Sequence, residues 1–271
     1  MLNKLTSLLY GTKAGRLVLP TLISPAVSNL AGIILDTKIS RCLIAPFIKS
    51  AKINMDEFID TPYNSFNEFF TRKIKSSARP IDEDPKHLIA PCDGRLTVHP
   101  IDDNSVFSIK GTEYTLESLF RSKTLADYYN GGTLLLFRLC VDDYHRYCFM
   151  DDGEKSKTHH IKGFYHTVNP LANEHYEIYK ENTREFCMLK SKNFGNLLIM
   201  EVGAMLVGRI TNYAAKKYVK RGEEKGRFEY GGSTIIVCLK KDAATIDENI
   251  LLNSQNNIET IVKMGAKIGT K

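Results

Sequence analysis

The 271-residue sequence lacks the short motifs that mark several large enzyme classes. It has no G-x-G-x-x-G that opens a helix and no P-loop, so a dinucleotide-binding or nucleoside-triphosphate-binding fold is not indicated. It has no H-E-x-x-H, and none of its six cysteines forms a C-x-x-C pair, so we predict no metal site. It also has no internal repeat and no run of Lys and Arg of the kind that follows nucleic-acid phosphates.

The composition is that of an ordinary globular protein with a basic balance. Hydrophobic residues make up 43% and charged residues 25% of the chain, and the net charge is +6. A positive charge favours an anionic partner, and without a basic run we expect a membrane surface rather than a nucleic acid. The isolated cysteines lie mostly in apolar runs, which predicts buried, reduced thiols.

The first 50 residues differ from the rest of the chain. An uncharged stretch from Leu17 to Leu35 contains Pro20 and Pro25, and a spanning helix needs about 20 mostly apolar residues. A second apolar patch, residues 42–48, has basic residues on both sides. We interpret this region as short helices with apolar faces. They either lie in a membrane interface or pack on the body of the protein or a second subunit.

Strands dominate the pattern after the helical start. Residues 65–68 form an S-x-x-E capping box for a helix through Phe69–Ile74, which Arg79-Pro80 should end. Strands are expected at 95–98, 106–109, 134–141, 147–150, 161–168, 197–202, 206–210 and 234–239, and a short helix and a terminal strand after residue 242. We therefore predict an α+β fold, predominantly β. A helical segment, residues 1–65, would precede a barrel-like or sandwich-like catalytic core, residues 66–271.

Four side chains are candidates for catalytic roles. Ser233 follows the flexible pair Gly231-Gly232 and precedes a buried strand. Asp93 lies on an Asp-Gly turn, His145 follows an apolar strand, and His166 stands in a strand that runs into an Asn-Pro turn. Each has a structural explanation as well: a tight turn, a turn before a strand, a surface histidine, and a packed strand residue.

Taken together, several short motifs carry a resemblance to a known family. In chain order they are Phe69-Phe70-Thr71-Arg72, Arg79-Pro80, Pro91–Gly94, Asp143-Tyr144-His145-Arg146, Thr167-Val168-Asn169-Pro170, Glu201-Val202-Gly203-Ala204 and Gly231-Gly232-Ser233-Thr234. The chain from about Phe66 to its end resembles phosphatidylserine decarboxylase, in the form common in anaerobic Gram-positive bacteria.

The resemblance implies that the protein makes its own cofactor. The Ser233 hydroxyl would attack the Gly232 carbonyl, and elimination and hydrolysis would leave a covalent pyruvoyl group at residue 233 and two associated chains, 1–232 and 233–271. Phosphatidylserine would form a Schiff base with it, lose CO2 and leave as phosphatidylethanolamine. We also expect a homodimer bound peripherally to an anionic surface, the cytoplasmic side of the cell membrane, and no nucleic-acid partner.

The resemblance also assigns roles, with one departure. Asp93 would order a base that activates Ser233, and His145 would protonate the substrate carbon. Many members carry a second histidine three positions after the first, where this chain has Cys148. A thiol has a reference pKa of about 8.5, so we predict that His166 fills that place and pairs with Asp93. His145 and Cys148 remain alternatives for the self-cleavage base.

Two other functions fit parts of the pattern. Ser233, His145 and Asp93 could form a Ser-His-Asp hydrolase acting on lipid esters, although the sequence has no G-x-S-x-G elbow. The chain could also be a non-catalytic β domain that binds membranes. Chain integrity separates the three, since only the decarboxylase should split itself between Gly232 and Ser233.

Overall fold

The computed structural model describes residues 32–103, 105–109, 112–162, 183–203, 209–213, 217–229 and 233–271. At residues 108–109, 112–114 and 233 it describes the backbone alone. His166 and Gly232 lie outside the described residues, as do most of the strands predicted at 161–168 and 206–210.

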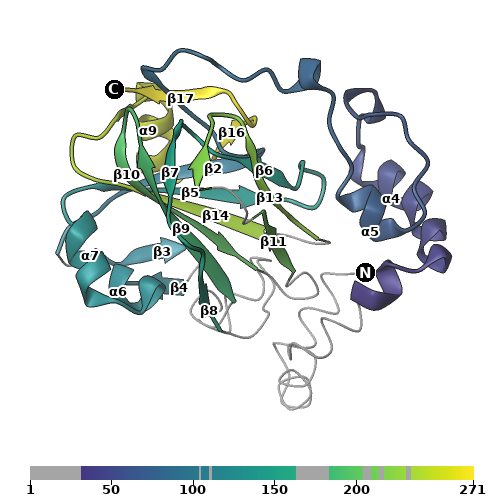
Figure 1. The fold of residues 1–271 in the computed structure, drawn as a ribbon, viewed down its shortest axis with the longest axis horizontal. Helices are drawn as coiled ribbons and strands as arrows, with labels where there is room; N and C mark the ends of the chain where they lie inside the picture. The colour runs from purple at the N-terminus through teal and green to yellow at the C-terminus, as the bar shows by residue number, and fades with distance from the viewer. Residues whose placement is uncertain are drawn as a thin grey trace.

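A nine-stranded antiparallel sheet forms the centre of the molecule (Figure 1). In spatial order its strands are β12 (Tyr218–Val219), β7 (Gly153–Lys155), β9 (Arg184–Ser191), β10 (Gly195–Val202), β14 (Ser233–Leu239), β5 (Thr133–Leu139), β2 (Gly94–Pro100) and β16 (Thr260–Val262), with β8 (His159–Ile161) paired to β9. The predicted α+β, predominantly β fold is confirmed.

Smaller antiparallel sheets and short helices surround this sheet. One sheet has the order β1 (His87–Ile89), β17 (Lys267–Thr270), β15 (Thr245–Ile246); another has the order β11 (Ile210–Asn212), β13 (Glu224–Phe228), β6 (Arg146–Cys148); β3 (Phe107–Ile109) pairs with β4 (Thr112–Tyr114). The α-helices are α4 (Ile44–Ala51), α5 (Phe66–Phe70), α6 (Leu116–Phe120), α7 (Lys123–Tyr129) and α9 (Glu248–Gln255). The 3-10 helices are η1 (Lys38–Leu43), η2 (Met55–Glu57) and η3 (Ser76–Ala78).

Strand β14, which begins at the predicted cleavage point, lies in the interior of the central sheet. It pairs with β10 on one side and β5 on the other. Ile235 and Val237 enter one hydrophobic core, which the three-stranded sheet of β6 also lines, and Ile236 and Cys238 enter a second core under α6 and α7. Because both of its faces are buried, the strand reads as one continuous apolar run, and its prediction from sequence is confirmed.

The chain changes sheets at the predicted cleavage point. Strand β13 ends at Phe228 in the sheet with β6 and β11, and β14 begins at Ser233 in the central sheet. The segment that contains Gly231 and Gly232 is therefore the connection between two sheets that enclose one core.

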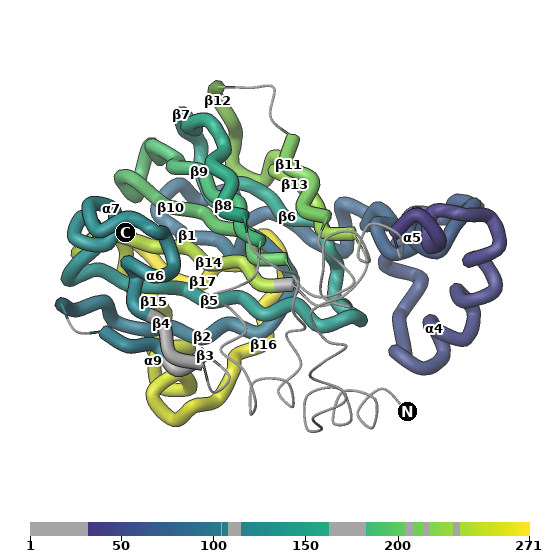
Figure 2. The backbone as a smooth tube through the Cα atoms, turned by 90° about the horizontal axis from the view of Figure 1, so that it is seen from below, coloured from purple at the N-terminus to yellow at the C-terminus, as the bar shows by residue number. Residues whose placement is uncertain are grey.

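The helices before the β core lie together beside it (Figure 2), and their aromatic residues form a separate cluster. Phe66, Phe69 and Phe70 of α5 are buried against apolar residues that include Phe47 of α4. The Ser65 side chain accepts a hydrogen bond from Glu68 N at 3.1 Å, as a capping box requires. This part of the helical segment thus packs on α5, whatever else its outer face contacts.

The structure corrects one element boundary near the aromatic cluster. The helix expected to run as far as Arg79-Pro80 ends at Phe70. Thr71 stops it, because its hydroxyl donates to the Asn67 carbonyl at 2.9 Å and competes with further helical turns. Among the described residues, no helix combines the length and the apolar character needed to cross a membrane.

Candidate active site

Register brings Asp93 and Ser233 to the same edge of the central sheet. Ser233 pairs with Leu139, the last residue of β5. On the other side of β5, strand β2 begins at Gly94, next to the Arg138 carbonyl. Two strand spacings of roughly 4.8 Å therefore separate the backbones of Gly94 and Ser233, about 10 Å in all. One side chain fits between a carboxylate and a hydroxyl across that span.

Asp93 is buried in a dense set of donors. Its exposed fraction is 1%. Arg79 Nε donates to Oδ1 and Oδ2 at 2.8 and 3.0 Å, and Arg79 Nη2 donates to Oδ2 at 2.6 Å. Met264 N donates to Oδ1 at 2.9 Å, and Lys263 Nζ donates to Oδ2 at 3.3 Å. The sequence-based interpretation gave Asp93 an imidazole partner, whereas these contacts come from two cations and a backbone amide.

Gly94 is what lets Asp93 reach this position. Its φ of +153° is a conformation that side-chain-bearing residues rarely adopt. A Cβ at residue 94 would also lie 2.8 Å from the Arg138 carbonyl oxygen. The Asp-Gly turn therefore needs glycine for both conformation and space at the point where β2 begins.

His145 lies at the start of β6 and is also buried, with 1% exposed. Its Nδ1 is 2.9 Å from the Asp143 carbonyl oxygen, a contact in which the ring N–H donates. The neutral ring then carries its proton on Nδ1 and its lone pair on Nε2. The Phe70 ring packs on the imidazole with 4.2 Å between ring centroids. His145 is thus held by two motifs that are far apart in the sequence, and it is not among the groups that bind Asp93.

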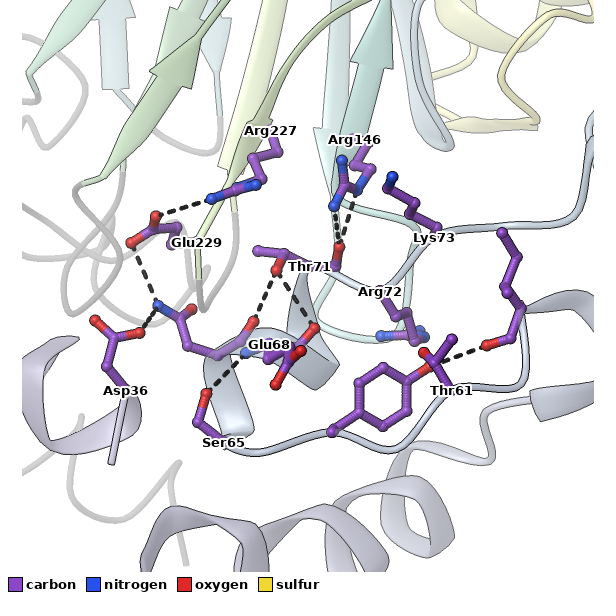
Figure 3. Close-up of a pocket in the computed structure, with 13 residues that line it drawn as sticks. Asp36, Thr61, Ser65, Glu68, Thr71, Arg72, Lys73, Arg146, Arg227 and Glu229 are labelled. Atoms are coloured by element: carbon purple, nitrogen blue, oxygen red, sulfur yellow. Dashed lines mark hydrogen bonds and ion pairs between the residues drawn. The ribbon is translucent and has the colours of Figure 1, made fainter. Parts of the chain in front are cut away.

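A cavity of about 540 Å³ opens between α5 and the sheet of β6 and β13 (Figure 3). Arg146 and Arg227 line it from the strands, and Lys73 lines it from the segment after α5. Arg146 donates from Nε and Nη2 to the Thr71 carbonyl at 2.9 and 2.7 Å. Glu229, four residues before Ser233, completes this wall. The cavity wall therefore includes Arg146, the residue that follows His145 in the chain, and Glu229, the last described residue before Ser233.

The thiols near Asp93 are poor bases. Cys148 and Cys92 are buried in the same core. Burial raises the pKa of Cys148 to about 12 and places the pKa of Cys92 well above its ordinary value. A thiol with so high a pKa carries almost no thiolate at neutral pH. The six cysteines are free in the structure; four of them are buried as predicted, whereas Cys140 is half-buried and Cys42 is exposed.

A buried ion pair that the sequence did not indicate joins β10, the strand beside β14, to β13. Glu201 of β10 and Lys225 of β13 are 0% and 2% exposed. Lys225 Nζ is 2.8 Å from Glu201 Oε1 and donates to Asn212 Oδ1 at 2.7 Å, and Asn212 Nδ2 donates back to Glu201 Oε2 at 2.9 Å. In the sequence, Glu201 was noted only as part of the family motif Glu201-Val202-Gly203-Ala204. Nothing in the polar sequence of β13 marked Lys225 as buried.

Sequence comparison places the chain among known proteins. A family model described as phosphatidylserine decarboxylase matches residues 66–270. The chain belongs to the phosphatidylserine decarboxylase family. The phosphatidylserine decarboxylase proenzyme 2 of Clostridium acetobutylicum is 45% identical over 262 residues, which cover 96% of this chain and 90% of that protein. The proenzymes of Clostridium tetani and Ruminiclostridium cellulolyticum are 43% and 41% identical, and the matches cover 90% and 98% of this chain and 84% and 91% of theirs.

Family membership makes the protein a carboxy-lyase, as the motifs predicted. It gives no support to the lipid hydrolase or to the non-catalytic membrane domain. Among the described residues, ligand atoms of Cys140, Asp142 and Asp143 lie within 4.8 Å of one another. Arg95 Nη1 lies 3.3 Å from Asp143 Oδ2, and the Cys140 amide donates to the same oxygen at 2.7 Å. These contacts explain why the three side chains lie close together: an ion pair and a hydrogen bond hold them in the turn after β5.

Proposed function

We propose that this enzyme converts phosphatidylserine to phosphatidylethanolamine and CO2, using a pyruvoyl group that it makes from Ser233. The observation that carries the proposal is the place of Ser233. It is the first residue of the central strand β14 and directly follows the segment that joins two sheets. The related proteins are named proenzymes, which supports processing of the chain.

Self-cleavage at this junction balances without an external reagent other than water. The Ser233 oxygen bonds to the Gly232 carbonyl carbon while the C–N bond breaks, so the amide becomes an ester and the nitrogen takes up a proton. A base then removes the Cα proton of residue 233, and Gly232 leaves as a carboxylate. Hydrolysis of the resulting dehydroalanine releases ammonia. The first step needs a general base ordered near Ser233, and we assign the ordering of that base to Asp93, which precedes Gly94 at the same edge of the central sheet.

The residue-233 position suits a covalent cofactor. Ser233 pairs with Leu139, and Thr234 pairs with Arg138 and with Val202, so the strand end is anchored on both sides. A cofactor formed at residue 233 would therefore keep a fixed position relative to the side chains around it. When present, a pyruvoyl carbonyl supplies an electron sink joined to the substrate amine.

The two chains of the cleaved enzyme should remain together. Residues 233–271 contribute β14 to the centre of the nine-stranded sheet, β16 to its edge and β17 to the middle of another sheet. The six side chains from Thr234 to Leu239 are each at most 1% exposed. Burial of a large aliphatic side chain stabilises by about 1.5–3 kcal/mol. Cutting one bond before Ser233 leaves all of these contacts in place.

His145 is the proposed acid for the substrate carbon. Its Nδ1 is committed to the Asp143 carbonyl, so a protonated ring would release its proton from Nε2. The cavity described above is lined by the cations Arg72, Lys73, Arg146 and Arg227 and by the anions Asp36, Glu68 and Glu229. The small excess of positive charge in its wall favours an anionic headgroup. A volume of about 540 Å³ falls within the usual range for small-ligand sites.

The helical segment is the proposed contact with the cell membrane, on its cytoplasmic side. Ile33, Ile34, Ile39 and Leu43 are 60%, 58%, 84% and 47% exposed, although they are large and apolar. Lys38 and Arg41 lie among them in η1. An apolar face with basic residues beside it is the pattern of helices that lie in an anionic membrane interface. The homodimer expected from the resemblance stays a prediction.

The proposal is tested by replacing the nucleophile. The wild-type enzyme should appear as two chains and decarboxylate phosphatidylserine in mixed micelles. Ser233→Ala should give one uncut chain that folds and has no activity. An active wild-type enzyme that stays full length, or an uncut Ser233→Ala enzyme that keeps its activity, would contradict the proposal.

A further inference from the structure

The Asp93 carboxylate has no acceptor position left for an imidazole. A carboxylate offers about four lone-pair sites. Oδ1 accepts from Arg79 Nε and from Met264 N, and Oδ2 accepts from Arg79 Nη2 and from Lys263 Nζ. A base that is to be ordered by Asp93 must therefore take the place of one of these donors.

The donors differ greatly in how firmly they are held. Arg79 is 7% exposed and is tied down at its other end, where Nη1 lies 2.9 Å from Glu57 Oε2 and donates to the Ala78 carbonyl at 2.6 Å. The Lys263 side chain is 52% exposed, and its contact with Oδ2, at 3.3 Å, is the longest of the four. Lys263 is the donor that water can most readily replace, whereas Arg79 is fixed.

The chemistry of the two side chains points the same way. A guanidinium presents a planar fork that matches both oxygens of a carboxylate, whereas an ammonium is a point charge on a flexible stem. Burial lowers the pKa of Arg79, but its hydrogen bonds with Asp93 and Glu57 and their charges raise it above its ordinary value overall. Arg79 is therefore a permanent, oriented cation at the sheet edge.

We propose that Arg79 is a positioning residue for self-cleavage, and that Lys263 covers the Oδ2 position which the imidazole of the base occupies when Ser233 is activated. Arg79 fixes the carboxylate in plane and in place at the start of β2. Lys263 shields it until the base arrives. The inference rests on the self-cleavage proposed above and adds the two residues that control the carboxylate.

The test is the rate of self-cleavage of the full chain made by cell-free synthesis, followed as the appearance of the two products on a gel. A misplacement of about 1 Å costs on the order of 100-fold in rate, so Arg79→Gln should slow cleavage by about that factor. Arg79→Lys should recover part of the rate, because it restores the charge without the fork. Lys263→Met should cleave at least as fast as the wild type.

A matched control removes an arginine elsewhere, Arg221, whose side chain is 9% exposed. Arg221 bonds to the Asp82 and Asp84 carbonyls at 2.7 and 2.8 Å. Arg221→Gln should therefore lower the melting temperature yet leave the cleavage rate of the folded chain near the wild-type value. This control separates loss of stability from loss of positioning.

Two results would overturn the inference. One is a folded Arg79→Gln chain that cleaves at the wild-type rate. The other is a folded Lys263→Met chain that cleaves about 100-fold more slowly than the wild type, and this arm decides even if Arg79→Gln does not fold. A wild-type chain that stays whole would instead refute the proposed function, and with it the step that Arg79 is proposed to support.

Discussion

Replacing Lys225 by Met should be among the most damaging changes to the β core. The Lys225 ammonium lies 2.8 Å from Glu201 Oε1 in a region from which water is excluded. Methionine keeps most of the side-chain volume but removes the charge. Glu201 would then be a buried carboxylate with the Asn212 amide, at 2.9 Å from Oε2, as its remaining described donor.

The expected loss follows from leaving one charge of a buried pair uncompensated. Breaking such a pair costs about 3–5 kcal/mol, a large share of a typical total stability of about 5–15 kcal/mol. The double variant Glu201→Gln/Lys225→Met should recover most of the loss, because it removes both charges. Urea unfolding should be measured in the Ser233→Ala background, where a single uncut chain keeps the free energy of unfolding independent of chain association.

The loss should also depend on pH in a defined direction. Burial raises the pKa of Glu201 above its ordinary value, against the opposing effect of Lys225. Without Lys225 the folded state should hold the Glu201 proton to still higher pH than the unfolded state, whose carboxyl has a pKa of about 4.3. The variant should therefore lose stability, relative to its parent, as pH rises from about 5 to about 8. A loss below about 1 kcal/mol, smaller than breaking a buried pair costs, or one that is equal at both pH values, would refute this reasoning.

Four further variants test the site and the membrane face. Cys148→Ala should self-cleave at the wild-type rate, since burial raises the thiol pKa to about 12; a cleavage rate that drops on a time-course gel would make the thiol a participant. His166→Ala should block processing, whereas His145→Ala should process but turn over slowly in a CO2-release assay; the opposite pattern would make His145 the self-cleavage base. Ile39→Glu, at a side chain that is 84% exposed, should weaken sedimentation with anionic vesicles without lowering the melting temperature; unchanged vesicle binding would assign this face to protein contacts.

Some of the fold was predictable because single elements carried strong local signals. Strand β14 is a β-branched apolar run that follows two glycines, and Ser65 is a helix cap whose Glu68 partner stands three residues later. The short helix and terminal strand after residue 242 appear as α9 and β17, with β16 between them. Such signals come from residues that are close together in the chain, so they can be recognised without knowledge of the tertiary structure.

Polar strands were missed for a physical reason. β13 has the sequence Glu-Lys-Gly-Arg-Phe, which shows no apolar alternation. Lys225 is nevertheless buried, because Glu201 on another sheet neutralises it. Hydrophobic periodicity cannot detect a side chain whose burial depends on a partner elsewhere in the fold.

The partners of Asp93 could not be predicted from the sequence either, because they too come from distant parts of the chain. The Asp-Gly turn and its carboxylate were evident from sequence, but Arg79 was interpreted only as part of a helix stop and of a family motif, with no link to Asp93. Lys263 stands 170 residues after Asp93 and was not considered. Their meeting depends on β2 pairing with β16, which carries the following residues 263 and 264 back to the start of β2. Sequence identified the carboxylate, and only the sheet register revealed what holds it.

The most direct measurement of the central claim is the intact mass of the purified wild-type enzyme. We expect two species, residues 1–232 with an ordinary carboxyl terminus and residues 233–271 lighter than the serine-initiated chain by one ammonia. That deficit is what conversion of Ser233 to a pyruvoyl group requires. A single species with the mass of the full 271-residue chain, or a C-terminal chain that retains its serine amine, in an enzyme that decarboxylates phosphatidylserine, would contradict the account.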